Sequence, residues 1–309
     1  MAQHSLTMIT DGVGYFPGSV NIGLVLGQTG AILIDSGLDT QTAKKIKKGL
    51  DQIAQPLSAI VQTHAHADHF GGNAYLLSCW PEAKVYAPPL EEAVIRYPLL
   101  EPIYLGMGAQ PLEELRNKFL LAEASRVDHL LPNEGPVEID GVLFQVISLP
   151  GHSWNQAGLA VENILFAADS FFGEETLHKH KLPFLVDAHE TLLSLVKLLE
   201  SNFRGYLPGH GPYTTSPEAV LTANIHCHRR LYRMIEEALT EERTLEQCLA
   251  SVCERLQISI ENATSYVLYR TALMGYLIGL LKEERVSYRF FANQWLWGKA
   301  ALAQDGLDR

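Results

Sequence analysis

The segment from Thr63 to Gly72 constrains this chain most, because it gathers three imidazoles and a carboxylate within six residues. It reads Thr-His-Ala-His-Ala-Asp-His-Phe-Gly-Gly and follows the apolar stretch 57–62, which predicts a short buried strand. Gly71 and Gly72 allow the backbone to turn closely into a following helix. The polar side chains are therefore expected on a loop between a strand and a helix.

The spacing within this segment favours two bound metal ions. Side chains two residues apart in an extended segment point the same way, so His64 and His66 can share one ion while Asp68 and His69 turn toward a second. Imidazole and carboxylate without thiolate suit zinc first, and manganese and iron accept the same donors. The alternative is a solvated polar loop, but such loops favour Gly, Asn and Ser over clustered His. We expect two divalent cations, with Zn²⁺ preferred.

The signature His-x-His-x-Asp-His resembles that of the metallo-β-lactamase superfamily, and three later residues extend the resemblance. Taken singly, each is weak, since a His after Pro-Gly is commonly a turn residue and an Asp after a strand is commonly a helix cap. Their order and their shared position after apolar stretches match the family: His152 after 142–149, Asp169 after 164–168 and His210 after 206–208. The resemblance implies one metal bound by His64, His66 and His152, a second bound by Asp68, His69 and His210, and Asp169 as the bridge.

Three further positions remain open to two interpretations. Asp35 ends the apolar stretch 31–34 and resembles the family's carboxylate beneath the metals, but it would equally cap a helix starting near Thr40. Tyr213 lies three residues after His210 and is placed to donate to an oxyanion, although a Tyr after Gly-Pro also packs on surfaces. His178 and His180 either border the pocket or belong to an exposed polar loop.

The alternation of segments predicts an α/β catalytic domain over residues 1–214. Strands are expected at 20–27, 31–34, 59–62, 84–87, 137–139, 142–149, 158–161 and 164–168, with helices at 40–53, 72–79 and 188–201. The resemblance implies an αβ/βα sandwich with the site at strand ends. Residues 88–135 form an apolar insertion with a helix-like stretch at 112–121. We expect this insertion to serve as a lid or dimer contact that favours a substrate with an apolar portion.

Residues 215–309 predict a second, mainly helical domain. Apolar positions recur there at helical spacing, and Thr244 with Gln247 matches a capping box. The stretch 275–286 resembles the last helix and turn of the winged-helix-like tail of some superfamily members, in a glyoxalase II-like or lactamase-B-like subgroup. This domain holds eleven Lys and Arg against twelve Asp and Glu, whereas nucleic-acid surfaces concentrate positive charge. Nucleic-acid binding is therefore disfavoured without being excluded.

Composition is that of a soluble globular enzyme, with 47% hydrophobic and 19% charged residues among 309. The four cysteines show no C-x-x-C spacing, which favours free thiols in a reducing compartment. The N-terminal residues lack a signal-peptide pattern, and no apolar run has membrane-spanning length. We therefore expect a cytoplasmic protein with no membrane contact.

These observations favour a hydrolase that uses a metal-bridging hydroxide. Asp68 is the expected catalytic residue, since the resemblance implies that it binds a metal and also orients the nucleophile or passes a proton. The acidic first domain and the apolar insertion favour a small-molecule ester, thioester or lactone with an apolar portion. A ribonuclease or phosphodiesterase is the alternative, and a non-catalytic metal-binding protein is the least favoured interpretation. A homodimer is also expected.

Overall fold

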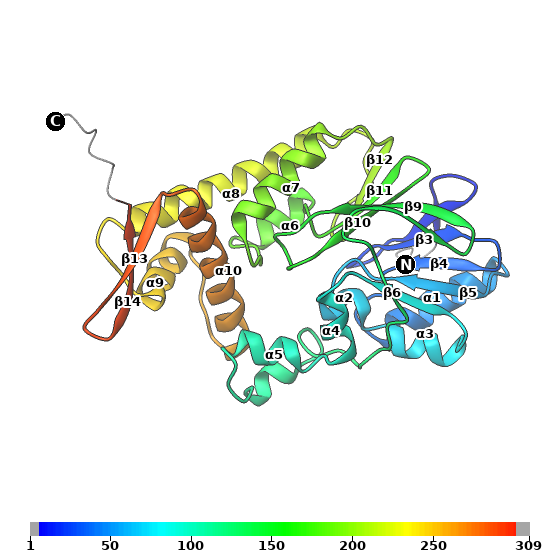
Figure 1. Cartoon of the computed structure of the whole chain (residues 1–309), viewed down its shortest axis with the longest axis horizontal. Helices are drawn as coiled ribbons and strands as arrows, with labels where there is room; N and C mark the ends of the chain where they lie inside the picture. The colour runs from blue at the N-terminus through cyan, green and yellow to red at the C-terminus, as the bar shows by residue number, and fades with distance from the viewer. Residues whose placement is uncertain (1–5, 301–309) are drawn as a thin grey trace.

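Two β-sheets packed face to face form the centre of the computed structural model, which describes residues 6–300 (Figure 1). Residues 1–5, which carry part of the argument about a signal peptide, and 301–309 lie outside the described residues. Helices cover the outer face of each sheet, and a mainly helical unit lies at one end of the sandwich. This arrangement confirms the predicted αβ/βα sandwich with a mainly helical C-terminal part.

The first sheet contains seven strands within the described range, and they lie side by side in chain order: β1 (Thr7–Met8), β2 (Val13–Phe16), β3 (Ile22–Leu26), β4 (Ala31–Ile34), β5 (Leu57–Val61), β6 (Lys84–Ala87) and β7 (His129–Leu130). Strands β1 to β4 pair antiparallel, whereas β4 to β7 pair parallel. Parallel strands bring their carboxyl ends to one edge of the sheet. The histidine-rich loop follows β5 at that edge.

The second sheet holds the later segments, in the order β12 (Gly205–Pro208), β11 (Ile164–Ala168), β10 (Ala157–Val161), β9 (Val142–Ser148) and β8 (Gly135–Ile139). Only β11 and β12 are parallel neighbours among these five. Asn21 joins the two sheets, because its side chain donates to the carbonyl oxygens of Pro208 (2.9 Å) and Gly211 (2.6 Å). The strand expected at 20–27 is shorter than predicted and forms β3, Ile22–Leu26.

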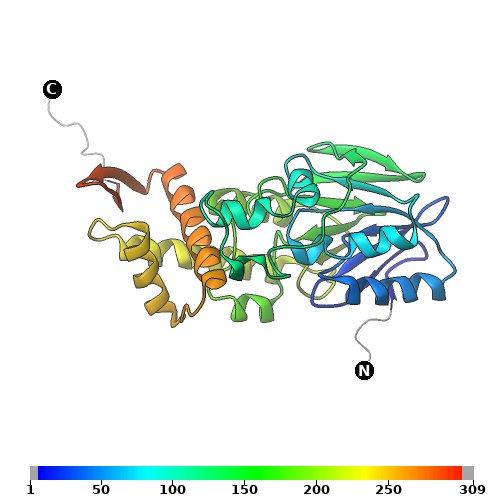
Figure 2. The same cartoon turned by 90° about the horizontal axis from the view of Figure 1, so that it is seen from below.

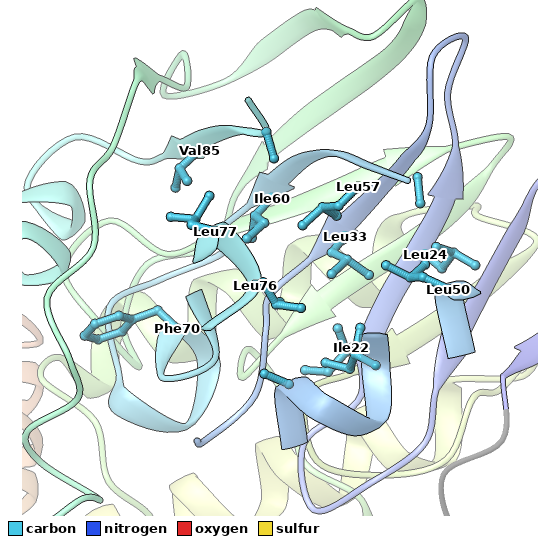
Figure 3. Close-up of a cluster of buried hydrophobic side chains, with 14 of the residues drawn as sticks. Ile22, Leu24, Leu33, Leu50, Leu57, Ile60, Phe70, Leu76, Leu77 and Val85 are labelled. Carbon is cyan, nitrogen blue, oxygen red and sulfur yellow. The ribbon is translucent and has the colours of Figure 1, made fainter. Parts of the chain in front are cut away.

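Three clusters of buried apolar side chains lie between the layers of the sandwich. On β4, Leu33 faces α1 (Thr40–Gln52) and α3 (Asn73–Cys79), while Ile32 and Ile34 face the second sheet. Figure 3 shows Leu33 with other sheet residues beside Leu50 of α1 and Leu76 of α3. On the far side, α7 (Ala188–Glu200) and the first half of α8 (Glu218–Ala238) cover the second sheet. Strands buried on both faces explain the continuous apolar runs in the sequence.

The insertion 88–135 differs from the expectation in its local structure. The helix predicted at 112–121 is wrong, because only Glu113–Arg116 forms a short 3₁₀ turn, η1. The Asn117 side chain follows this turn and donates to the carbonyl oxygen of Glu114 (2.7 Å) and to Thr264 Oγ1 (3.1 Å). Long-range contact thus replaces local helical preference. The loop-like stretch before it contains two short helices, α4 (Glu91–Arg96) and α5 (Leu100–Leu105).

The C-terminal part combines helices with a final hairpin. It comprises the second half of α8, α9 (Leu245–Leu256), α10 (Ala263–Lys282) and the hairpin β13 (Val286–Phe291) and β14 (Gln294–Lys299). The predicted capping box of Thr244 and Gln247 is confirmed at the start of α9. Both views place the hairpin at the end of the molecule away from the sheets (Figures 1 and 2). The core of this part also takes in Leu182 and Leu185, from the segment before α7.

The insertion packs against the start of α10. Leu105, Leu115 and Leu120 form a buried cluster with Val267, and Phe184 packs on its edge. Figure 1 shows α5 beside the lower end of α10. No helix among residues 6–300 is both long enough and apolar enough to cross a membrane.

Candidate metal centre

All seven sequence-predicted ligands converge at one edge of the sandwich. The loop after β5 and the short helix α2 (Ala67–Phe70) carry the first four, and the loops after β9, β11 and β12 carry the others. Strand ends from both sheets thus meet at a single place. The donor atoms fall into three overlapping groups, each with all atoms within 4.8 Å of one another: His64, His66 and His152; His64, His69 and Asp169; Asp68, His69 and His210.

The first group is compact. His66 Nδ1 lies 3.1 Å from His64 Nε2 and 2.9 Å from His152 Nε2. The other ring nitrogen of His152 lies 3.1 Å from the carbonyl oxygen of Phe184, and Nδ1 of His64 lies 3.0 Å from the Thr63 hydroxyl. These outer contacts orient the rings so that the inner nitrogens face one another.

Asp169 lies between the two sides of the centre. Its Oδ1 is 3.3 Å from His69 Nε2, and its Oδ2 is 3.4 Å from His152 Nε2 and 3.3 Å from His210 Nε2. On the second side, Asp68 Oδ2 lies 3.4 Å from His210 Nε2. The Nδ1 atom of His210 lies 2.6 Å from the carbonyl oxygen of Ser19. One carboxylate therefore contacts histidines of both outer groups.

The residues present fit divalent cations. His69 Nε2 and Asp169 Oδ1 are buried and lie 3.3 Å apart, and neither atom makes a hydrogen bond of good geometry among the described residues. Buried polar atoms without partners are rare and need an explanation, such as an ion. Neutral imidazole and carboxylate donors suit Zn²⁺, Mn²⁺ or Fe²⁺. The donor chemistry and the two unpartnered atoms thus agree with metal binding.

Asp35 supports the centre from beneath rather than capping a helix. Its carboxylate lies 2.8 Å from His69 Nδ1 and accepts from the Thr63 N–H (2.8 Å) and hydroxyl (2.8 Å). The residue is buried with a φ of 64°, a conformation that Asp tolerates better than most residues. The cap of α1 is Asp39, which accepts from the Thr42 N–H at 3.0 Å. The helix-cap interpretation of Asp35 is therefore wrong, and Asp35 instead contacts the candidate ligand His69.

The candidate ligand histidines fall into two groups, one with lowered and one with raised pKa values. Burial and the neighbouring His152 lower the pKa of His66 to about 3, and burial also lowers the pKa of His64 well below its usual range. For His210, burial opposes protonation, but Asp169 and Asp68 outweigh it and raise the pKa to about 10. The same carboxylates, with Asp35, raise the pKa of His69 against the effect of burial. A cation that binds on the His210 side therefore displaces protons, which couples its binding to pH.

Two sets of candidate residues do not join the donor groups. Tyr213 folds back along β12, so that a Cβ added to Gly205 at the start of that strand would lie 1.9 Å from its hydroxyl. This position explains why Tyr213 is not brought to the donor atoms at the opposite end of β12. His178 and His180 lie on and just after α6 (Glu174–Lys179), so a short helix stands where one of the two interpretations expected an exposed polar loop. The Nδ1 atom of His178 contacts the carbonyl oxygen of Glu174 at 2.8 Å.

Sequence reasoning missed several residues around the centre. The Phe184 ring lies 5.2 Å from the His66 ring and 5.9 Å from the His152 ring, and the Phe172 ring lies 5.8 Å from the His152 ring. Glu101 of the insertion is buried, and burial followed by Asp68 and Glu91 raises its pKa well above its usual range. These residues follow no motif and reach the centre only through tertiary packing. No local signal would have found them.

Comparisons with known proteins agree with the fold and the motif. The family model described as the metallo-beta-lactamase superfamily matches residues 15–210. A lactamase-like protein of Pestalotiopsis fici is 24% identical over 283 residues, covering 88% of this chain and 77% of that protein. A hydroxyacylglutathione hydrolase of Xylella fastidiosa is 28% identical over 142 residues, but the match covers 46% of this chain and 41% of that enzyme.

A solved structure shares the fold along almost the whole chain. The crystal structure of a beta-lactamase domain protein from Burkholderia ambifaria aligns with a TM-score of 0.73 and 15% sequence identity. The alignment covers 97% of this chain and 96% of that one. The likeness therefore includes the C-terminal helices.

An αβ/βα sandwich with histidine and aspartate donors at its strand ends, matched by hydrolase relatives, defines a metal-dependent hydrolase. The family match spans well over half of the sequence. This chain belongs to the metallo-beta-lactamase superfamily.

Proposed function

We propose that this protein is a binuclear metal hydrolase that cleaves an ester, thioester or lactone with an apolar portion. The single observation that carries the proposal is the contact of Asp169 with histidines of both outer donor groups. One carboxylate in that position suits a pair of neighbouring cations better than a single ion. Zn²⁺ is the preferred metal because it accepts imidazole and carboxylate donors and leaves a position open for water.

The residues would divide between two metals. His64, His66 and His152 would hold one, Asp68, His69 and His210 the other, and Asp169 would contact both. Bound divalent cations supply Lewis acidity and lower the pKa of water, so that hydrolysis proceeds near neutral pH. Partial burial raises the pKa of Asp68, but His69 and His210 outweigh it and lower the pKa to about 2. Asp68 is therefore ionised, and its carboxylate would both bind metal and accept or pass a proton during cleavage.

The surroundings support a neutral substrate with an apolar portion. Aromatic rings of Phe184 and Phe172 flank His152, and the insertion carries exposed apolar side chains at Tyr97, Tyr104 and Met107. Residues 1–214 hold thirteen Lys and Arg against twenty-three Asp and Glu, which disfavours strongly anionic substrates. The hydroxyacylglutathione hydrolase among the relatives favours a thioester. The insertion 88–135 would act as a lid over the substrate or as a dimer contact. A cytoplasmic location would suit the free thiols of the four cysteines.

A ribonuclease or phosphodiesterase is the second candidate. The hairpin β13–β14 resembles a wing, and its exposed Tyr288, Phe290 and Trp295 cluster together. Bases of single-stranded nucleic acid stack on such aromatic side chains. The near balance of charges in residues 215–309 argues against this candidate, since phosphate binding needs cations.

A turnover panel tests the proposal. Zinc- or manganese-loaded protein is incubated with an acyl thioester, a lactone and a labelled single-stranded RNA, and His152→Ala serves as the control. We expect cleavage of an acyl substrate that is lost in the variant, with the RNA intact. If only the RNA is cleaved, and its rate of cleavage falls steeply as the salt concentration rises, the result would instead support the ribonuclease or phosphodiesterase.

A deletion tests the role of the insertion separately. We expect removal of residues 97–110 to weaken substrate binding or to change the oligomeric state. Unchanged affinity and unchanged oligomeric state would contradict both roles.

A further inference from the structure

Glu91 is a buried carboxylate outside the ligand set, and it joins the two loops that carry the first group of histidines. It is the first residue of α4, at the start of the insertion, and only 5% of its surface is exposed. A carboxylate buried to this degree needs several hydrogen-bond donors. Glu91 has three.

The three donors come from two separate loops. The N–H of Ala65 donates to Oε2 at 3.0 Å, and Ala65 lies between His64 and His66. The hydroxyl of Ser153 and the N–H of Asn155 donate to Oε1 at 2.7 and 2.9 Å, directly after His152. One loop follows β5 in the first sheet, and the other joins β9 to β10 in the second. Glu91 thus spans the two sheets at the point where His66 and His152 approach to 2.9 Å.

The arrangement is sensitive to the chemistry of this one side chain. All three partners are donors, so both carboxylate oxygens must accept. A glutamine has the same shape, but its NH₂ group would face at least one donor and leave that contact repulsive. The N–H groups of Ala65 and Asn155 have no other acceptor among the described residues. Burial raises the pKa of Glu91, while its three donors oppose that effect.

We propose that Glu91 is a positioning residue that sets the spacing of His64, His66 and His152 and couples the insertion to metal binding at that group. The inference rests on the proposed function, because it requires these three histidines to hold a cation. Outer contacts of this kind commonly change metal affinity 10- to 100-fold when they are removed. Coupling between sites is reciprocal, so cation binding at the histidines also stabilises the docked position of α4.

Zinc affinity and stoichiometry provide the main test. Wild-type protein, Glu91→Gln and the control Glu92→Gln are titrated against a chromophoric zinc chelator, and circular dichroism checks folding. Glu92 is the next residue on the same helix and pairs with Arg96 at the surface. We expect Glu91→Gln to weaken one of two zinc sites by about 10- to 100-fold, while the other site and the control keep the affinity of wild type.

Hydrogen exchange tests the coupling without reference to activity. Residues 88–105 of the wild type should become more protected when zinc is added, and Glu91→Gln should lose most of that change. A merely structural role for Glu91 would lower protection equally with and without zinc. Equal zinc affinity in both proteins, or an equal zinc-dependent gain of protection, would overturn the proposal.

A second variant covers the case in which Glu91→Gln does not fold. Ser153→Ala removes one of the three donors and leaves the two backbone contacts. We expect a smaller loss of affinity at the same site, and an unchanged affinity would count against the proposal. If the wild type itself binds only one zinc ion, at the His210 side, that result would contradict the proposed binuclear centre itself. The role of Glu91, which rests on that centre, would then fall as well.

Discussion

Replacing Asp35 by asparagine removes one acceptor beneath the metal centre while keeping the shape of the side chain. In the wild type the carboxylate lies 2.8 Å from His69 Nδ1 and also accepts from the N–H and hydroxyl of Thr63. An asparagine oxygen still accepts from Thr63, but the amide nitrogen cannot accept from an imidazole N–H. His69 therefore loses the contact that directs its other nitrogen, Nε2, toward Asp169.

The size of the effect follows from this single contact. A hydrogen bond to a charged, buried acceptor contributes about 1.5–3 kcal/mol. An outer contact of a metal ligand commonly changes affinity by about 10- to 100-fold, which corresponds to about 1.4–2.7 kcal/mol. The two ranges agree, so we expect Asp35→Asn to weaken zinc binding on the His69 side by about 10- to 100-fold.

The assay is competition with a chromophoric chelator, alongside urea denaturation of the zinc-free protein. Asp39→Asn is the matched control, because Asp39 caps α1 away from the donor groups and asparagine caps helices equally well. Zinc affinity of Asp35→Asn within twofold of wild type, in a folded protein, would refute the reasoning.

Further predictions concern the ligands, the pH dependence and the metal itself. Asp68→Ala and His152→Ala should abolish turnover in steady-state assays of metal-replete protein, and retained activity in either would contradict the assignment of ligands. His228 is buried beside Tyr276, with Nδ1 2.7 Å from the tyrosine oxygen, and burial lowers its pKa to about 4. Because the unfolded chain takes up this proton near pH 6.5, the folded state loses about 3 kcal/mol as pH falls from 6.5 to 4. Urea denaturation at pH 7 and pH 4 should show a smaller loss for His228→Gln, and equal losses would exclude this origin. Chelation should lower the free energy of unfolding by about 4 kcal/mol relative to protein in zinc at 1,000-fold above its dissociation constant. An unchanged melting temperature after chelation would show that the donors hold no metal.

Local patterns predicted a large part of this protein. The strands at 31–34, 84–87 and 164–168 have the bounds of β4, β6 and β11. β4 and β11 are buried along their whole length and therefore form continuous apolar runs in the sequence. The capping box at Thr244 was equally readable, since its hydrogen bonds span only three residues. The ligand motif specified its chemistry because the His and Asp side chains are close in sequence and suit the same cations.

Tertiary structure alone decided the contacts between distant segments. The helix predicted at 112–121 gave way to η1 and an irregular stretch that packs on α10, because contacts such as Asn117 with Thr264 outweigh weak local preference. The direction of Tyr213 depended on the bridge between the next residue, Thr214, and Tyr206 of β12, which no spacing from His210 reveals. Glu91 and Phe184 show the same principle at the metal centre. Their positions beside the candidate ligands come from separate loops and sheets that meet in space. The sequence by itself therefore determined the donor chemistry, and only the fold decided which side chains surround it.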